Sequence, residues 1–396
     1  MLEGLKVVEL ATYVAAPSAT AVMSDWGADV IKIESGRGDP TRRTFAGQPH
    51  LEGNPVFEWE NHGKRGVVLD TGKPAGREAL LRILKDADIF VTNLRPGALK
   101  RAKLDYDSLK AELPRLIYVS ITGYGLEGPG ADLPAFDMAA LWSHGGIGGA
   151  MTPRGHEPPQ CRPGMGDSIC ALSAVSGALA AVIERSTTGK GRLVEASLIR
   201  AGTFAIGWDM AIQLKWSRLA TQRTRKEVLD PLSNYFRTSD ERWVGIFPRD
   251  GRDEFEHIVK VLDLPALASD PRFATARDRA QNVAALVEAL DEGFARLTLA
   301  EAGRRLTDAD MIWGPLNAPR DTVVDPLAEA AGCFVDIVDA DGVAYRQPTS
   351  PARFPGAPEG PQRPAPKLGQ HTREVLAAAG YMRDEIETLI AEGAAT

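Results

Sequence analysis

The first 122 residues alternate between short apolar runs and longer amphipathic stretches. Short runs rich in β-branched residues predict buried strands, and apolar residues at helical spacing predict helices between them. The strands are expected at residues 6–10, 28–34, 66–69, 89–92 and 116–121. The helices between them are expected at residues 18–26, 75–85 and 106–112. This alternation predicts an α/β fold in which helices cover both faces of a largely parallel sheet.

The next segment contains the longest helical pattern of the chain. Residues 168–185 are rich in Ala and Leu and contain no Pro, which favours a helix. A turn at residues 188–191 leads to an expected strand at 193–197 and a helical stretch that ends near residue 217. The most apolar run, residues 169–183, is shorter than the roughly 20 residues of a membrane span, so no span is expected.

The pattern changes near residue 230, which indicates a second, smaller domain of α+β type. Residues 235–247 read as a hairpin that turns at 239–241, and helices are expected at 252–262, 280–296 and 299–306. Residues 340–367 are rich in Pro and Gly and predict an extended surface segment. A helix is expected at residues 372–379, ending at Gly380.

Composition narrows the function without identifying it. The 396 residues are 44% hydrophobic and 25% charged, as in ordinary soluble proteins. A net charge of −7 argues against sequence-independent nucleic-acid binding, so an anionic ligand needs a local cluster of cations. Three scattered cysteines and six histidines without metal-ligand spacing predict neither a disulfide framework nor a metal site. This cysteine usage, and a start without a signal-peptide pattern, fit a reducing cytoplasm.

Asp167 is the first candidate for chemistry. It stands in a short segment of small residues directly before the helix expected at 168–185. The amino end of a helix carries partial positive charge and free N–H groups, which favour an ionised carboxylate. Such a carboxylate can attack an acyl carbonyl. The alternative is that Asp167 only caps the helix.

Two nucleotide-binding patterns are incomplete. The β-α-β opening, with Glu34 at the end of its second strand, invites a dinucleotide interpretation. However, residues 11–17 contain none of the glycines that let the backbone approach a pyrophosphate. Residues 188–191 include Gly-Lys but lack P-loop spacing, so we interpret them as a turn.

Nine short motifs, taken in chain order, resemble the class III coenzyme A transferase family. This family includes formyl-CoA transferase, the crotonobetainyl and carnitine CoA-transferases, and the related α-methylacyl-CoA racemases. The motifs occupy residues 4–10, 27–34, 61–65, 93–97, 123–125, 166–167, 188–191, 270–273 and 368–372. Each motif is short, but the whole series in order along nearly the entire chain is specific.

The resemblance implies a fold and an assembly. The family has a Rossmann-like large domain built from both chain ends and a small inserted domain, and two subunits interlock as a dimer. By resemblance, residues 1–218 and 325–396 form the large CoA-binding domain here, and residues 219–324 form the small domain. The protein is therefore expected to be an interlocked homodimer.

The resemblance also implies a reaction. It identifies Asp167 as the family nucleophile of a CoA-transferase, which moves coenzyme A from an acyl-CoA thioester to a carboxylic acid acceptor. The implied intermediates are an aspartyl anhydride and an aspartyl-CoA thioester. Coenzyme A is then a substrate, and we expect no tightly bound cofactor and no metal. The expected partners are an acyl-CoA, a carboxylic acid and a second copy of the chain, with no nucleic acid and no membrane.

Coenzyme A needs cations for its phosphates and a lining for its body. The positions that match the family's CoA-lining segments, or supply a cation there, are Tyr13, Val14, Leu69, Gly72, Lys73, Asn93, Leu94, Arg95 and Arg101. Weaker candidates for phosphate contacts are Arg42, Arg43, Lys64 and Arg65.

Four further residues are candidates for the substrate or oxyanion region. Backbone N–H groups of Gly145 and Gly146 are candidates for stabilising oxyanions, since glycine permits close approach; a mobile loop is the alternative. His144 is a candidate by position, and a packing role is as compatible with its surroundings. Asp137 matches an acidic position near the family active site, and the sequence does not define its role.

Departures from the family pattern narrow the reaction. The racemases carry Gly-His-Asp where this chain has Ala135-Phe136-Asp137, and Phe136 cannot exchange a proton. A transferase is therefore favoured over an acyl-CoA racemase or isomerase. The glycine-rich small-domain loop of formyl-CoA transferase is absent, which argues against formate or oxalate as substrate. A noncatalytic protein that binds CoA without a covalent adduct is the third alternative.

Overall fold

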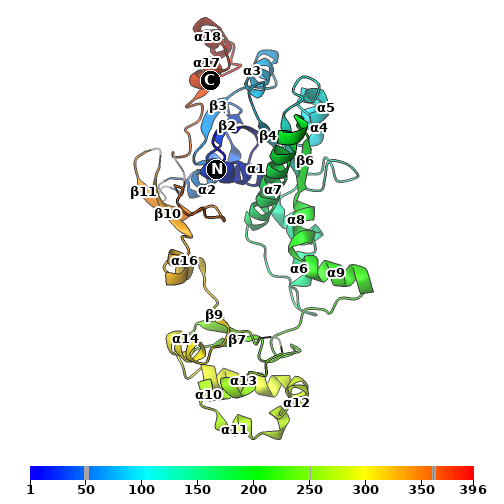
Figure 1. The fold of residues 1–396 in the computed structure, drawn as a ribbon, viewed down its shortest axis with the longest axis vertical. Coiled ribbons are helices and arrows are strands. Elements are labelled where there is room, and N and C mark those ends of the chain that lie inside the picture. Colours follow the sequence, from blue (N-terminus) through cyan, green and yellow to red (C-terminus); the bar gives the residue numbers. More distant parts are fainter. Residues whose placement is uncertain (49–52, 250, 340, 359, 361–362) are drawn as a thin grey trace. The chain divides into compact units, whose positions relative to one another are not determined.

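The computed structural model describes residues 1–48, 53–249, 251–339, 341–358, 360 and 363–396. These residues divide into two compact units (Figure 1). Unit 1 comprises Met1–Ala150, Pro159–Leu219 and Ala331–Thr396, and unit 2 comprises Met151–Pro158 and Ala220–Ala330. Unit 1 is thus assembled from both ends of the chain. The α/β class predicted from the alternating pattern is confirmed.

Unit 1 contains a six-stranded parallel sheet in the order β3-β2-β1-β4-β5-β6. Its strands are β1 (Lys6–Leu10), β2 (Asp29–Glu34), β3 (Arg65–Val68), β4 (Ile89–Thr92), β5 (Ile117–Thr122) and β6 (Leu193–Ser197). The strand order reverses between β1 and β4, which pair with each other. Loops that leave the carboxyl ends of these two strands diverge, and ligands of doubly wound sheets bind there.

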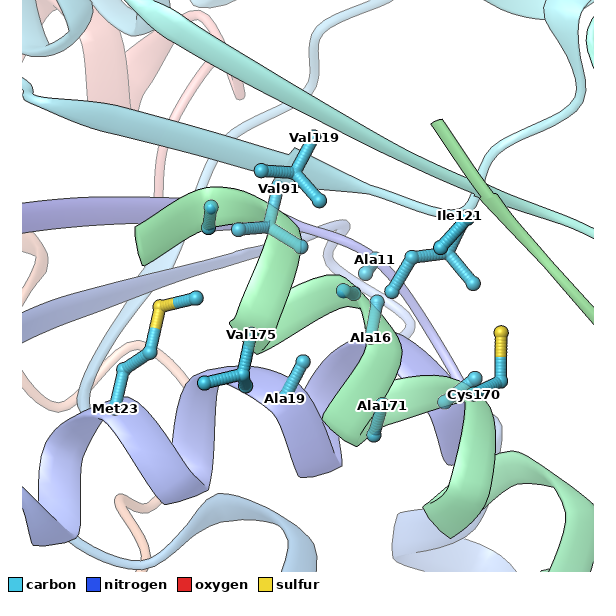
Figure 2. Packing of buried hydrophobic residues seen from close by; sticks show 14 of the residues in the cluster. Ala11, Ala16, Ala19, Met23, Val91, Val119, Ile121, Cys170, Ala171 and Val175 are labelled. Atoms are coloured by element: carbon cyan, nitrogen blue, oxygen red, sulfur yellow. The ribbon is translucent and has the colours of Figure 1, made fainter. Parts of the chain in front are cut away.

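Helices cover both faces of this sheet because alternate strand residues point to opposite sides. Val7 joins one core cluster and Val8 the other. On the Val7 side, α1 (Ala15–Asp25) packs against α7 (Met165–Thr188) through small residues such as Ala16 and Ala171 (Figure 2). The opposite cluster includes residues of α3 (Pro74–Leu84), α4 (Pro96–Ala102), α5 (Tyr106–Leu109), α17 (Thr372–Ala378) and α18 (Arg383–Ala391).

The remaining elements of unit 1 connect these layers. The helical ones are η1 (Pro40–Arg43), α2 (Pro55–Asn61), the π-helix η2 (Met138–His144), α6 (Ile147–Ala150), α8 (Leu198–Ala205) and α9 (Gly207–Trp216). The strands β10 (Phe334–Val338) and β11 (Ala344–Pro348) pair as an antiparallel hairpin. This hairpin lies partly within residues 340–367, the segment expected to be extended on the surface, and residues 344–348 of that segment form a strand that pairs with β10. Residues 340, 359, 361 and 362 of the segment lie outside the described residues.

Unit 2 has its own core around a three-stranded antiparallel sheet. The sheet comprises β7 (Asn234–Arg237), β8 (Trp243–Ile246) and β9 (Trp313–Pro315), so the predicted hairpin is confirmed and a third strand joins it. The helical elements are α10 (Phe255–Leu262), α11 (Pro265–Ala268), η3 (Pro271–Phe273), α12 (Ala276–Gln281), α13 (Val283–Phe294), α14 (Leu299–Asp308), α15 (Pro319–Thr322) and α16 (Pro326–Ala330).

The helix expected at residues 168–185 is longer at both ends. It runs for 24 residues, from Met165 to Thr188, and Gly164 and Gly189 flank it in left-handed conformations. Within the described residues, α7 is the one helix long and apolar enough to cross a membrane by length and composition alone. It contributes Cys170, Ala171 and Val175 to the core cluster of unit 1, which accounts for its apolar composition.

Candidate active site

A cavity of about 580 Å³ opens at the carboxyl ends of β1, β4 and β5, with the start of α7 in its wall. Its lining includes six of the residues predicted from the sequence, namely Tyr13, Val14, Asn93, Leu94, Arg95 and Asp167. Thr12, Ala15, Thr122, Gly123, Leu133, Ala135, Phe136 and Leu198 are among the other lining residues. The cavity thus lies where the strand order reverses, as expected for a ligand site of a doubly wound sheet.

The loops that follow β1 and β4 are joined by a pair of hydrogen bonds. The Thr12 N–H donates to Asn93 Oδ1 at 3.1 Å, and Asn93 Nδ2 donates to the Thr12 carbonyl oxygen at 2.6 Å. The amide side chain of Asn93 therefore acts as a bridge between two backbone segments. These two hydrogen bonds fix the spacing between the loop that carries Tyr13 and the loop that carries Arg95.

Tyr13 adopts a backbone conformation that is uncommon for an aromatic residue. Its φ is +64°, in the left-handed region, and its N–H donates to Asp39 Oδ1 at 3.2 Å. Asp39 is fully buried and also accepts from Lys32 Nζ at 3.0 Å. The Tyr13 ring meets the Phe136 ring edge-on, with 5.5 Å between ring centroids. A buried ion pair thus holds the turn that places this aromatic wall.

Asp167 is the third residue of α7, so the interpretation of Asp167 as the N-cap was wrong. The helix begins earlier because Gly164 takes the left-handed cap position, which a glycine adopts without strain. The expected preference for the ionised form is also overturned. Burial, and next the charge of Asp137, raise the pKa of Asp167 to about 7. Desolvation therefore outweighs the favourable helix terminus.

Asp137 organises the first turn of α7. Its Oδ2 accepts the Gly166 N–H at 3.0 Å, and its Oδ1 accepts the Met138 N–H at 2.9 Å. The side chain is buried, at 2% exposure. A Cβ on Gly166 would stand 2.9 Å from the Asp137 Cβ, so the glycine is required for this approach. Asp137 thus fixes the backbone immediately before Asp167 and supplies a negative charge beside it.

Gly145 and Gly146 do not offer free N–H groups to a substrate. The Gly145 N–H donates to the Ala140 carbonyl oxygen at 3.0 Å, and the Gly146 N–H donates to the Ser143 carbonyl oxygen at 3.3 Å. A Cβ on Gly145 would meet the Gly202 Cα at 3.0 Å, so this glycine allows η2 and α8 to pack closely. The expected oxyanion role of both glycines is therefore wrong for this structure. His144 packs its ring edge-on against Tyr124 at 5.2 Å.

Four residues predicted to contact CoA do not line the cavity. Leu69 is buried and forms a β-bridge with Ala395. The Gly72 N–H donates to Asp70 Oδ1 at 3.0 Å, and Lys73 Nζ donates to the Glu392 carbonyl oxygen at 2.6 Å. Arg101 is exposed on α4 and, like Arg95, forms no ion pair with any described residue.

The weaker cation candidates are held in the protein, and three have carboxylate partners. Lys64 is fully buried with its Nζ 2.8 Å from Glu9 Oε2. The Arg42 guanidinium lies 2.6 Å from Glu34, and that of Arg65 lies 2.5 Å from Asp29. Arg43 donates to the Arg37 carbonyl oxygen at 2.5 Å. The charges of Arg42, Lys64 and Arg65 are therefore already paired, which argues against phosphate binding by these three residues.

The helix α2 carries a buried polar group that the sequence pattern does not indicate. Glu60 is 1% exposed, and its carboxylate accepts a hydrogen bond from the Ser18 hydroxyl. Burial, opposed in part by Ser18 and Lys64, raises the pKa of Glu60 to about 8, and the charge of Asp167 adds to the rise. The sequence would predict burial of Glu60 only if its hydrogen-bond partner were known. That partner, Ser18, lies 42 positions away in the sequence.

The described residues contain no group of three or more His, Cys, Asp or Glu side chains placed to hold a metal ion. The cavity offers one carboxylate, one guanidinium and two aromatic rings. This arrangement suits nucleophilic attack by a carboxylate on a substrate bound across the sheet edge.

Comparisons with known proteins agree on one family. The sequence model described as CoA-transferase family III matches residues 2–372. An (R)-2-hydroxy-4-methylpentanoate CoA-transferase of Clostridioides difficile is 32% identical over 98% of this chain and 97% of its own length. A cinnamoyl-CoA:phenyllactate CoA-transferase of Clostridium sporogenes is 32% identical over 98% and 96%, respectively. The crystal structure of a CAIB/BAIF family protein from Brucella suis has a TM-score of 0.85 and 31% identity, covering 96% of this chain and 99% of that one.

Proposed function

Because the chain belongs to CoA-transferase family III, we propose that Asp167 is the nucleophile with which it moves coenzyme A between an acyl group and a carboxylic acid. The observation that carries this proposal is the position of Asp167. Among the described lining residues of the 580 Å³ cavity, it is the only carboxylate. It stands at the start of a long helix, at the sheet edge where ligands of this topology bind.

The chemistry needs no energy source besides the thioester. An oxygen of ionised Asp167 attacks the thioester carbonyl carbon, the carbon–sulfur bond breaks, and CoA leaves as thiolate, giving a mixed anhydride. The thiolate attacks the Asp167 carbonyl carbon, releases the donor carboxylate and forms an aspartyl-CoA thioester. The acceptor carboxylate attacks this thioester and expels the thiolate again. Thiolate attack on the acceptor carbonyl then forms the new acyl-CoA and restores Asp167.

Asp137 serves this reaction as a positioning residue. It holds the Gly166 N–H at 3.0 Å and so sets the first turn of α7. Its negative charge also makes Asp167 a stronger base and a better nucleophile when ionised, since both effects follow the raised pKa. With a pKa of about 7, Asp167 is about half ionised near pH 7. The reaction is therefore expected to accelerate as the pH rises through that value.

Coenzyme A is proposed to lie along the edge of a Rossmann-like sheet. Arg95 lines the cavity and has no ion-pair partner among the described residues, and Asn93 holds the loop that carries it. Arg101 on α4, also without an ion pair to any described residue, supplies a second cation for the phosphates. The order of the six parallel strands supports the Rossmann-like assignment. Leu69, Gly72 and Lys73 are proposed as more distant contacts of the same ligand.

A homodimer is part of the proposal, as is a cytoplasmic location. Large apolar side chains are exposed on α8 and α9, where Phe204 is 84%, Trp208 83% and Leu214 83% exposed. Monomeric proteins rarely expose such a concentration of apolar surface, which supports a contact with a second copy. The interlocked arrangement comes from the family resemblance alone. Sedimentation equilibrium tests the dimer, with a mass of twice 42.6 kDa as the expected result.

The decisive experiment is trapping of the covalent intermediate. Asp167→Ala and Asp167→Asn should abolish CoA exchange while leaving CoA affinity nearly unchanged. Incubation of the wild type with acyl-CoA and hydroxylamine should modify Asp167, detected by peptide mass spectrometry, because an activated aspartyl carbonyl reacts with that nucleophile. Wild-type exchange rates in either variant would remove Asp167 from the mechanism. CoA binding with no adduct after many turnovers would favour the noncatalytic alternative.

The racemase alternative is separated by one further measurement. Phe136 occupies the position of the racemase histidine and stands in the cavity wall. A phenyl ring cannot move the α-proton that racemisation requires. We therefore expect no α-proton exchange when the protein is incubated with a 2-methylacyl-CoA in deuterated water. Exchange at a rate comparable with CoA transfer would contradict the transferase assignment.

A further inference from the structure

A second cavity, of about 180 Å³, lies within unit 1 between α1, α2, α7 and the segment after β11. Its lining includes Ser18 of α1, Glu60 of α2, and Ser168 and Ala171 of α7. Val14 and Ala15 line the first cavity, and Ser18 lies one helical turn further along α1. On α7, Asp167 lines the first cavity and the next residue, Ser168, lines the second.

The two cavities therefore meet consecutive turns of the same two helices. α1 and α7 pack side by side, and the Gly164 N-cap of α7 stands close to Val14, since a Cβ there would lie 3.9 Å from Val14 Cγ1. Since Asp167 and Ser168 are adjacent on α7, and Val14 and Ser18 are one turn apart on α1, the two cavities are neighbours along this helix pair. The charge of Asp167 acts on Glu60, which shows electrostatically that the two sites are neighbours.

Glu60 is the distinctive polar group of this cavity. One of its oxygens accepts a hydrogen bond from the Ser18 hydroxyl. The side chain is 1% exposed, so burial holds most of the carboxyl group in the protonated form near pH 7. A protonated Glu60 does not repel a negatively charged ligand directly. The low dielectric constant of its buried surroundings nevertheless makes such a ligand unfavourable there.

The other polar side chains of the lining also have hydrogen-bond partners, most of them outside the cavity wall. His62 Nε2 lies 2.8 Å from Asp25 Oδ1, and its Nδ1 lies 3.2 Å from Gln347 Nε2. The Ser168 hydroxyl donates to the Gly164 carbonyl oxygen at 3.0 Å. The remaining wall is apolar and comes from Ala21, Val22, Trp59, Ala171, Leu172 and Pro351. The cavity thus offers hydrocarbon contacts, a fixed acidic residue in Asp25, and no free cation for an anionic group.

We propose that this cavity binds the hydrocarbon chain of the carboxylic acid whose carboxyl group reacts at Asp167. The proposal rests on the transferase function proposed above. A volume of 180 Å³ holds about six non-hydrogen atoms, at roughly 30 Å³ for each water-sized group. The site therefore selects short, uncharged chains of about four to six carbons. A second carboxylate at the far end of the chain is rejected, because it would enter an apolar cavity beside Asp25 without a cationic partner.

The test compares acceptor acids at one donor, acetyl-CoA. Rates of acyl-CoA formation are measured for propanoate, hexanoate, decanoate and the dicarboxylate pentanedioate. With the wild type, hexanoate should have the highest kcat/KM, and pentanedioate should fall roughly 100-fold below it. Equal kcat/KM values for hexanoate and pentanedioate, or a steady increase up to decanoate, would overturn the proposal.

Two substitutions change the cavity in opposite directions. Ala171→Leu fills about half of the space and should raise KM for hexanoate roughly 10- to 100-fold, while propanoate changes by less than about threefold. Leu172→Ala enlarges the cavity and should shift the preferred chain toward longer acids. Leu179→Ala lies on the same helix outside the lining and is the matched control, expected to leave the chain-length profile unchanged.

The outcomes distinguish failure of this proposal from failure of the function. If every variant retains propanoate transfer but none alters the chain-length profile, the transferase stands and the cavity assignment is wrong. If Ala171→Leu lowers propanoate and hexanoate transfer equally, the cavity is structural. If a cavity variant changes the oligomer mass measured by light scattering but leaves the chain-length profile unaltered, a second copy of the chain fills the cavity. That result also overturns the proposal. Loss of trapping at Asp167 in the wild type would instead remove the function itself.

Discussion

Replacement of Asp137 by asparagine should lower the pH at which the enzyme becomes active. Burial comes first and the charge of Asp137 second among the causes that raise the pKa of Asp167 to about 7. Asparagine removes that charge but keeps an oxygen that can accept the Gly166 N–H, which is bonded at 3.0 Å in the wild type. The change therefore separates the electrostatic role of Asp137 from its role in holding the first turn of α7.

The magnitude follows from the Coulomb interaction of neighbouring carboxylates. At an effective dielectric constant near 20, two like charges interact by about 4 kcal/mol at a separation of about 4 Å and by about 2 kcal/mol at about 8 Å. One pKa unit corresponds to about 1.4 kcal/mol, and burial causes more of the rise than this charge does, so the pKa of Asp167 should fall by roughly one unit in the variant. Ionised Asp167 is the proposed nucleophile, and its fraction at pH 6 should rise from about one tenth to about one half.

The assay is the pH dependence of kcat/KM for CoA exchange, which reports ionisation in the free enzyme. The wild-type profile should rise with a midpoint near pH 7, and the Asp137→Asn profile with a midpoint near pH 6. Asp132→Asn is the matched control, because exposed Asp132 also accepts a backbone N–H, from Gly97 at 2.7 Å, and loses the same charge. A midpoint that stays near 7 in the Asp137 variant, or that moves equally in the control, would refute the reasoning.

Three further predictions concern CoA, stability and packing. Arg101→Ala should raise KM for acyl-CoA roughly ten- to hundredfold and change kcat little, because a phosphate contact is equal in ground and transition states; an unchanged KM for every CoA ester in steady-state assays would remove Arg101 from the site. Asp167→Asn should increase the free energy of unfolding more at pH 8 than at pH 5, as measured by urea unfolding. The pKa of Asp167 is raised to about 7 in the folded protein, so the wild type loses stability as the pH rises from the pKa of the unfolded chain toward 7, and the asparagine variant does not. An equal gain at both pH values would contradict the raised pKa. Gly145→Ala should lower the free energy of unfolding by about 2–4 kcal/mol, because its Cβ would lie 2.1 Å from the Leu141 carbonyl oxygen, whereas Gly149→Ala, with no atom within 4 Å, should change it by less than about 0.5 kcal/mol in the same experiment.

The strands of the sheet were predictable from the sequence because a strand buried on both faces is a continuous apolar run. β1 and β4 begin and end at the predicted residues, and β5 differs by one residue at each end. The cavity was partly predictable for the same reason. Once β1 and β4 are located, their following loops, which carry Tyr13 and Asn93, must lie at the same edge of the sheet.

The start of α7 was not predictable from local pattern. Gly164 and Gly166 have weak helix propensity, and the helix begins among them because Asp137, 29 residues earlier, accepts the Gly166 N–H. The packing role of Gly145 was not predictable for a similar reason. Position 145 requires a glycine because Gly202 packs against it, and no local sequence pattern predicts contact between two glycines 57 residues apart.

Buried charges were the hardest feature to predict. Lys64 looks like a surface cation in the sequence, yet it is fully buried against Glu9, which lies 55 residues earlier in a strand. Glu60 looks like an exposed residue of a short helix until Ser18 is brought beside it. Such pairs are specified by tertiary contacts, so composition and periodicity carry no signal for them.

Assembly of unit 1 from both ends of the chain affects how the protein is made on the ribosome. Val375, Leu376, Ile386 and Leu389 belong to the same core cluster as Val8 of the first strand, and Ala395 bridges to Leu69. This cluster therefore cannot close until residues 375–395 have been synthesised. Until then, nascent chains keep apolar residues of the early strands and helices exposed, which makes them natural clients of ribosome-associated chaperones. Termination before residue 375 would yield a chain that retains Asp167 but aggregates or is degraded.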